Sequence, residues 1–270
     1  MSIFTHWETR EANIKGRQML TRDKILQEMQ GEHPNIVIEP FFIECLGSDS
    51  YDLHLDDTLL VYKDTIPAGM KPAIPYDKAY FDELRKNPNV DGMRDWFIPA
   101  NQGRDYYEDY CLHPEKYDTR NLKCLLNPFE EKETVEIKIP EQGLILSPFV
   151  GYLGSTLEYT ETHNIFPFID GKSTIGRNFT LVHYTAGRGD RGFCGTWTLE
   201  INTRYPTVVK PGMRIGQIYY TESNGGMTTE YGSALGSHYK GQIKPTAAKP
   251  LKHDQCILDY LKKREATQTK

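Results

Sequence analysis

The sequence predicts an all-β domain, a distorted barrel or jelly roll that carries short flanking helices and an inserted lobe. From residue 134 onward, short runs rich in Val, Ile, Tyr and Phe are separated by turn residues at regular spacing. Phe193, Trp197 and Leu199 alternate with small or polar residues, which is typical of a strand with one buried face. Helical patterns are few and short, so strands must form most of the core.

The first elements precede the inserted lobe. "LTRDKILQEMQG" (20–31) predicts a short helix with Thr21 as N-cap and Gly31 as its stop. "NIVIEPF" (35–41) and "SYDLHLDDTLLVY" (50–62) predict strands. These segments open a domain that we expect to span residues 19–246, after an N-terminal extension at 1–18.

An insertion over about 64–133 interrupts the strand pattern with prolines, tyrosines and acidic residues. It contains one expected helix, "DKAYFDELRK" (77–86), closed by Asn87–Pro88. The expected strands after it are "TVEIKI", "GLILSPFVGYLGSTLEYTE", "FTLVHYTA", "CGTWTLEIN" and "TVVKPGMRIGQIYYTES". A C-terminal tail, 247–270, carries the helical pattern "DQCILDYLKKREA".

Composition limits the partners that we expect. A formal net charge of -5 over 270 residues does not favour nucleic acid, so any anion site must be local. The 5 cysteines include no CxxC pair, which favours reduced thiols and a cytoplasmic protein. The first residues do not form a signal-peptide pattern, and no apolar run approaches the roughly 18 residues of a membrane span.

The stretch "DGKSTIGRN" (170–178) is the first candidate site. Its glycines, Lys172, Arg177 and the hydroxyls of Ser173 and Thr174 suit a loop that cradles phosphate. It is not a P-loop, because Phe166 replaces the required upstream glycine and the surrounding pattern is strand rather than strand-to-helix. A solvated turn is the alternative interpretation.

The second candidate is "TAGRGDRGFCGTWTLE" (185–200). Glu200 ends the polar face of a half-buried strand, where apolar surroundings raise a carboxylate's proton affinity and suit it to proton transfer. Asp190 lies on the preceding glycine-rich loop and could accept a hydrogen bond from a sugar hydroxyl. Arg188 and Arg191 flank it and could face phosphate, although two surface acids are the alternative.

Two further stretches are weaker candidates for a functional site. "EYGSALGSHYKGQIKPT" (230–246) could close over a ligand, or form a glycine-rich tail. "HWE" at 6–8 matches half of a zinc nucleobase deaminase signature, but the P-C-x-x-C half is absent from the sequence. The other histidines show no ligand spacing, so we expect no zinc site.

Four motifs in order, "GKSTIGR", "HYTAGRGDRGFCGTWTLEI", "PGMRIGQIYY" and "HYKGQ", resemble those of dCTP deaminase in the dUTPase superfamily. "LTRDKIL", "IEPF" and "SYDLHL" resemble the family's start, so the resemblance covers roughly 19–62 and 134–246. "EYTETH" and "GDRGFC" are similar to the longer bacterial members. The resemblance implies a dUTPase-like fold.

The resemblance also implies roles for single residues. Glu200 matches the catalytic glutamate that passes protons between water, the pyrimidine ring and the departing ammonia. Ser173 and Arg177 match residues that organise that water and glutamate, and the carbonyl of Ala186 matches the position that holds the attacking water. Asp190 matches the aspartate that meets the deoxyribose.

The implied nucleotide-binding set is larger and includes two lid residues, Tyr231 and Gln242. Its members are Lys172, Ser173, Thr174, Arg177, Arg188, Asp190, Thr198, Leu199, Glu200, Tyr231, His238 and Gln242. Lys172 departs from the usual arginine and loses its fork. Gly189 replaces an isoleucine and is expected to loosen its loop, and His238 stands where lysine is frequent.

The resemblance further implies magnesium held by the triphosphate, no metal bound by the protein and no zinc. It implies a homotrimer with sites at subunit boundaries, and dTTP as a feedback inhibitor. We expect dCTP to become dUTP and ammonia, because Arg188 is similar to deamination-only members rather than to the tryptophan of bifunctional ones. The alternatives are a bifunctional dCTP deaminase/dUTPase that releases dUMP and pyrophosphate, and a nucleotide-binding regulator without catalysis.

Overall fold

The computed structural model describes residues 18–66, 71–86, 126–148, 150–222, 231–232 and 238–268. Nearly all of the expected N-terminal extension, the "HWE" match and the middle of the insertion lie outside these ranges. Within them the chain is mostly strand with a few short helices, which confirms the all-β prediction.

Short strands make up most of the described elements, with α1 and α6 near the two ends and a few short helices among the strands. They are α1 (Arg22–Glu28), β1 (Ile36–Glu39), η1 (Ile43–Cys45), β2 (Tyr51–His54), β3 (Thr58–Tyr62), η2 (Lys63–Thr65), β4 (Ala73–Pro75), α2 (Lys78–Leu84), β5 (Thr134–Lys138), β6 (Leu144–Leu146), β7 (Tyr152–Ser155), β8 (Tyr159–Thr162), β9 (Ile165–Gly171), α5 (Ser173–Arg177), β10 (Thr180–Leu181), β11 (Cys194–Gly195), β12 (Thr198–Thr203), β13 (Thr207–Val209), β14 (Arg214–Glu222) and α6 (Gln255–Gln268).

These strands form four antiparallel sheets with the orders β1-β8-β11, β10-β12-β7-β3-β5, β13-β6-β4 and β2-β14-β9. Most neighbours are distant in sequence, so the chain repeatedly crosses between sheets rather than forming hairpins. The described strands do not close into one barrel. The buried faces share a core whose largest fully buried side chains are Tyr51, Tyr152, Tyr220, Ile25, Ile36, Leu53, Leu55, Leu59, Leu146, Leu199 and Ile201.

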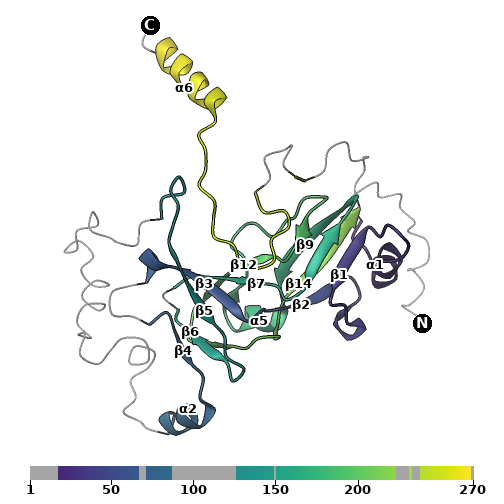
Figure 1. The fold of residues 1–270 in the computed structure, drawn as a ribbon, viewed down its shortest axis with the longest axis vertical. Helices are drawn as coiled ribbons and strands as arrows, with labels where there is room; N and C mark the ends of the chain where they lie inside the picture. The colour runs from purple at the N-terminus through teal and green to yellow at the C-terminus, as the bar shows by residue number, and fades with distance from the viewer. Residues whose placement is uncertain are drawn as a thin grey trace, which may run out of the picture.

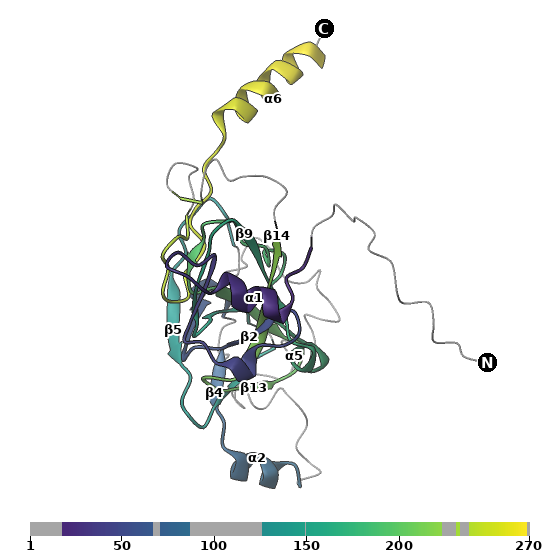
Figure 2. The same cartoon turned by 90° about the vertical axis from the view of Figure 1, so that its right-hand side faces the viewer.

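The predicted helices are present. Thr21 is the N-cap residue of α1, although its side chain makes no capping hydrogen bond. Asp77 caps α2, and its carboxylate accepts a hydrogen bond from the backbone N–H of Tyr80 at 3.1 Å. The tail pattern forms α6, which stands apart from the sheets in both views (Figures 1 and 2).

Several predicted strands are shorter than expected. The run 143–161 breaks into β6, β7 and the start of β8, and the run from Cys194 breaks at Gly195, which has φ +138. A Cβ at Gly195 would lie 2.6 Å from the carbonyl oxygen of Gln242, so this strand bends where the C-terminal segment lies against it. Strand β4 of the insertion was not predicted.

The prediction of a strand or loop environment around "DGKSTIGRN" is wrong, because strand β9 leads directly into helix α5. Five residues with one glycine are too few to show a helical period, and only Ile175 of this helix is buried. Within the described ranges, no helix has both the length and the apolar character needed to cross a membrane.

Candidate active site

A cavity of about 880 Å³ opens where β12 meets the loop before it, the end of the insertion and the C-terminal segment. The sequence predicted seven of its lining residues, namely Ala186, Arg188, Asp190, Thr198, Glu200, Tyr231 and Gln242. Two segments far apart in the sequence complete the wall, since it also includes residues between 126 and 132 and between 242 and 248. The cavity therefore unites the second and third candidate stretches.

Glu200 reaches this cavity because β12 alternates its side chains. Leu199 and Ile201 are buried in the core, and Glu200 between them is half-buried at the wall. Its Oε2 accepts a hydrogen bond from the backbone N–H of Tyr184 at 2.8 Å. The carboxylate is thus fixed by a donor that does not itself titrate, at the edge of a space large enough for a ligand.

The loop before β11 approaches its neighbours more closely than a side chain would allow. A Cβ at Gly187 would lie 2.5 Å from the carbonyl oxygen of Ile169, and one at Gly189 would lie 2.3 Å from the ring of Trp197. The indole N–H of Trp197 donates to Thr160 Oγ1 at 2.9 Å, which fixes the ring. Gly189 therefore permits close packing against the Trp197 ring, and the expectation that it loosens the loop stays a prediction.

Asp190 is held by a charged neighbour on the same loop. Arg188 Nη2 lies 2.9 Å from Asp190 Oδ1, and both side chains are about half exposed. The guanidinium of Arg188 also lies 5.9 Å from the ring centre of Phe166. The pair gives the cavity an oriented carboxylate beside a fixed positive charge.

Gln242 is fixed across Gly195 by polar contacts to Thr196. Its backbone oxygen accepts from the N–H of Thr196 at 2.8 Å, and its Nε2 donates to the carbonyl oxygen of Thr196 at 2.7 Å. Its Oε1 is buried and has no hydrogen-bond partner among the described residues. A buried acceptor without a partner costs free energy of folding, so this position is not optimised for stability alone.

The first candidate stretch lies elsewhere. Ser173, Thr174 and Arg177 on α5 are exposed and do not line the cavity of their own chain. Lys172, the N-cap residue of α5, directs its Nζ to Asp52, at 2.8 and 2.9 Å from the two carboxylate oxygens. Their roles in nucleotide binding stay predictions.

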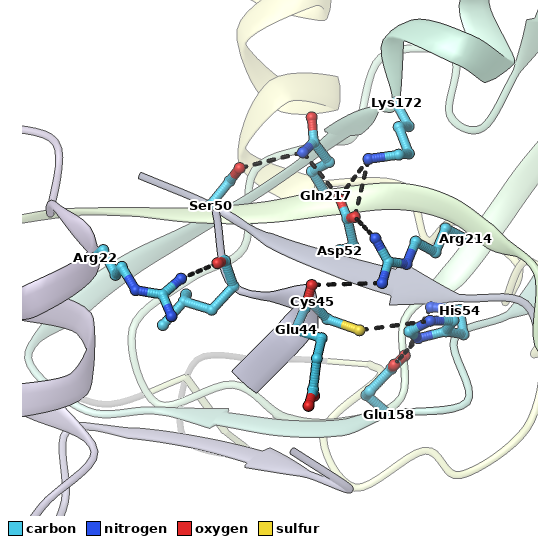
Figure 3. Close-up of polar contacts among 11 residues, drawn as sticks. Arg22, Glu44, Cys45, Ser50, Asp52, His54, Glu158, Lys172, Arg214 and Gln217 are labelled. Carbon is cyan, nitrogen blue, oxygen red and sulfur yellow. Dashed lines mark hydrogen bonds and ion pairs between the residues drawn. The ribbon is translucent and has the colours of Figure 1, made fainter. Parts of the chain in front are cut away.

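Asp52 organises a polar network that sequence reasoning missed (Figure 3). Its side chain is only 8% exposed, and it also accepts from Arg214 Nη1 at 3.0 Å and Gln217 Nε2 at 2.9 Å. The available signal was an acid inside the predicted strand "SYDLHL".

Two further predicted residues, Leu199 and His238, do not line the cavity.

Comparison with known proteins identifies the family of this chain. Residues 114–223 match the family described as dCTP deaminase-like. The proteins named "dCTP deaminase, dUMP-forming" include one from Cytophaga hutchinsonii, 44% identical over 147 residues, covering 52% of this chain and 84% of that protein. This chain belongs to the dCTP deaminase family.

A second relative supports the same assignment. A protein of the same name from Clostridium botulinum strain Eklund 17B is 46% identical over 191 residues, covering 71% of this chain and 76% of that protein. The resemblance predicted from the motifs is confirmed. A solved 2'-deoxycytidine 5'-triphosphate deaminase from Agrobacterium tumefaciens aligns with a TM-score of 0.43 and 17% identity, covering 77% of this chain and 48% of the other.

The family members correct the expected product. We expected dUTP on the strength of Arg188, but the relatives are named for forming dUMP, so that expectation is wrong. In the structure Arg188 pairs with Asp190 within the loop, so the identity of this residue alone is no guide to the product.

Sequence reasoning missed the wall that the insertion and the tail contribute. The residues missed there include Thr65, Glu130 and Lys132 of the insertion and Ala248 of the tail, together with Tyr62 at the end of β3. The tail is attached there by two backbone donors: the N–H of Ala248 donates to Tyr62 Oη, and that of Leu251 to the carbonyl of Pro128, both at 2.8 Å. These contacts join segments far apart in sequence, and no local pattern announces them.

Proposed function

We propose that this protein hydrolyses dCTP to dUMP, ammonia and pyrophosphate. The observation that carries the proposal is the carboxylate of Glu200, fixed by the Tyr184 N–H at 2.8 Å on the wall of a cavity that also holds Ala186 and Asp190. The names of the family members support dUMP as the product. Two water molecules are consumed, one at the base and one at the phosphate chain.

In the deamination step, Glu200 carries out the proton transfers. A water molecule beside the carbonyl of Ala186 loses a proton to the carboxylate as its oxygen bonds to the ring carbon that bears the amino group. Glu200 gives this proton to the ring nitrogen, then takes the second proton from the new hydroxyl and gives it to the amino group, and the carbon–nitrogen bond breaks as ammonia leaves. One carboxylate serves as base and then as acid, as general acid–base catalysis requires.

Cleavage of the triphosphate assigns a different role to Asp190. Its carboxylate, held 2.9 Å from Arg188 Nη2, orients a second water toward the phosphorus next to the deoxyribose. The water's oxygen bonds to that phosphorus while the bond to the departing pyrophosphate breaks. Asp190 accepts the water's proton, and dUMP remains.

Magnesium is proposed to accompany the triphosphate. The phosphate oxygens would hold the ion, and Glu130 at the cavity wall adds a carboxylate oxygen, the ligand class that this ion prefers, so the residues present fit it. The bound ion would neutralise charge on the phosphate oxygens. We also propose that dTTP inhibits by occupying the same cavity, because it carries the same sugar and triphosphate.

We further propose a homotrimer whose sites are shared between chains. Ser173, Thr174 and Arg177 are exposed and outside the cavity of their own chain, so a second copy would have to bring them to it. Exposed apolar side chains follow them, namely Phe179, Leu181, Tyr184 and Tyr205. Such a patch on a small domain is typical of a protein interface.

The free thiols of Cys45, Cys194 and Cys256 agree with a proposed cytoplasmic setting.

One assay tests the proposed reaction. The protein is incubated with dCTP and magnesium, the nucleotides are separated by chromatography, and ammonia and pyrophosphate are measured in parallel. We expect dUMP to accumulate with equal amounts of ammonia and pyrophosphate. Accumulation of dUTP without pyrophosphate would contradict the dUMP-forming reaction, and binding of dCTP without any product would favour a regulator.

A further inference from the structure

Cys45, His54 and Glu158 form a row of titratable side chains outside the nucleotide cavity (Figure 3). Cys45 ends η1, His54 ends β2, and Glu158 lies in the turn between β7 and β8. His54 Nε2 lies 3.8 Å from Cys45 Sγ, and its Nδ1 contacts Glu158 Oε1. The order is acid, imidazole and thiol, the order in which an imidazole activates a cysteine nucleophile.

The carboxylate fixes the orientation of the imidazole. Glu158 is fully buried, and its second oxygen, Oε2, accepts the backbone N–H of His54 at 2.9 Å. Both carboxylate oxygens are therefore committed to the same residue. Because Oε1 accepts the Nδ1 proton of the neutral ring, the basic nitrogen is Nε2, which faces the sulfur.

The surroundings restrict what this thiol could meet. Burial, reinforced by the charges of Glu158 and Cys45, raises the pKa of the neighbouring Tyr51 hydroxyl to about 12, so Tyr51 remains neutral. None of the three residues lines the cavity, and Cys45 is only 6% exposed, which leaves no room for a large substrate. No metal-binding group of His, Cys, Asp and Glu occurs among the described residues. Only a small reagent can react here.

We propose that Cys45 is a peroxide-reactive thiol, activated by His54 and oriented through Glu158. His54 Nε2 takes the thiol proton, and the sulfur attacks one oxygen of a hydroperoxide. The sulfur–oxygen bond forms as the oxygen–oxygen bond breaks, and the leaving oxygen recovers the proton from His54. With hydrogen peroxide the products are Cys45 sulfenic acid and water; the sulfur loses two electrons and the peroxide gains them.

Site-resolved trapping tests this on the full-length protein. The protein is treated with limiting hydrogen peroxide, samples are quenched with catalase at successive times, and each sample is then unfolded in the presence of dimedone, which captures sulfenic acid; adducts on separate peptides are measured by mass spectrometry. Cys256 on α6 is exposed and serves as the internal reference. We expect Cys45 to be labelled at least about tenfold faster than Cys256, although exposure alone predicts the reverse order. Labelling of Cys45 at or below the rate of Cys256 would overturn the proposal.

A substitution separates activation from accessibility. His54→Asn retains an amide N–H near Nδ1 and removes the group at Nε2, so Cys45 labelling should fall at least about tenfold while Cys256 is unchanged. His33→Asn, on an exposed histidine of the turn after α1, is the matched control and should change neither rate. Unchanged Cys45 labelling in a folded His54→Asn protein would refute the proposal. If that variant does not fold, the wild-type excess of Cys45 over Cys256 must vanish in urea, and persistence there would refute it equally.

Discussion

The wall of the cavity and helix α5 carry two halves of one predicted site, yet only the first half is assembled within a single chain. Glu200, Asp190 and Gln242 meet around one cavity although more than fifty residues separate the outer two. Ser173 and Arg177 are closer to Glu200 in sequence than Gln242 is, yet their side chains are exposed and lie outside the cavity. Sequence distance is therefore a poor guide to which site residues share a chain's own cavity.

The two halves also differ in how they are anchored. Gln242 and Glu200 are fixed mainly by backbone donors and acceptors of the neighbouring connecting segments. Helix α5 is anchored through a charged side chain, Lys172, on the buried carboxylate of Asp52. The cavity wall should thus tolerate loss of charge without unfolding, whereas α5 should not.

The largest effect is expected at the cavity wall. Glu200→Gln keeps the hydrogen bond from Tyr184 but cannot carry a proton, so turnover of dCTP should fall by roughly 10³- to 10⁴-fold with KM nearly unchanged. Steady-state kinetics measure this, with melting temperature as the folding check. Glu136→Gln, on an exposed acid of β5, is the matched control. Near wild-type turnover in a folded Glu200→Gln protein would show that Glu200 is not the residue that transfers the protons.

Mixing two weak variants tests whether α5 completes the site of another chain. In trimers refolded from equal amounts of Glu200→Gln and Arg177→Ala, some sites combine an intact Glu200 from one chain with an intact Arg177 from its neighbour. For random assembly these are about one quarter of all sites, and activity should recover to about that fraction of wild type. Light scattering should give about three chains per particle. A mixture no more active than its parents would confine each site to one chain.

The anchoring of α5 should appear in stability. Asp52→Asn leaves Lys172 and Arg214 without their shared carboxylate, so the free energy of unfolding should fall by about 2 to 3 kcal/mol. Urea denaturation measures the change. Asp57→Asn removes a carboxylate that is 51% exposed and paired with Lys138 at 2.8 Å, and should cost less than about 1 kcal/mol. Equal losses in both variants would contradict the anchoring role.

How much of this follows from the sequence depends on the range of the contacts involved. The alternation around Glu200 and the loop acid Asp190 are local patterns, and the structure places both residues at the cavity wall. Asp52 and Tyr62 act through partners more than a hundred residues away, so no local pattern identifies them. Helix α5 was missed for a different reason, since five residues cannot display a helical period.

A smaller and more specific effect is expected at Asp190. Asp190→Asn keeps the shape of the loop but weakens orientation of the second water, so pyrophosphate release should fall by roughly 10²-fold. Ammonia release should continue, with a raised KM if the carboxylate also meets the sugar, and dUTP should accumulate. The ratio of pyrophosphate to ammonia measures the separation. If both products fall together, the two hydrolyses do not divide between Glu200 and Asp190 as we propose.

The smallest effect concerns the wall that the tail contributes. Tyr62→Phe removes the hydroxyl that accepts the N–H of Ala248 at 2.8 Å, while the ring keeps its packing. A single neutral hydrogen bond contributes about 0.5 to 1.5 kcal/mol, so KM for dCTP should rise roughly two- to twelvefold with turnover preserved. Tyr80→Phe, on an exposed tyrosine of α2 whose ring packs edge-on against Phe81, is the matched control and should leave KM unchanged. A rise in KM only in Tyr62→Phe would mean that the tail forms part of the binding site. An unchanged KM in both variants would mean that the tail does not contribute to dCTP binding, which would then depend on the rest of the cavity wall and on α5.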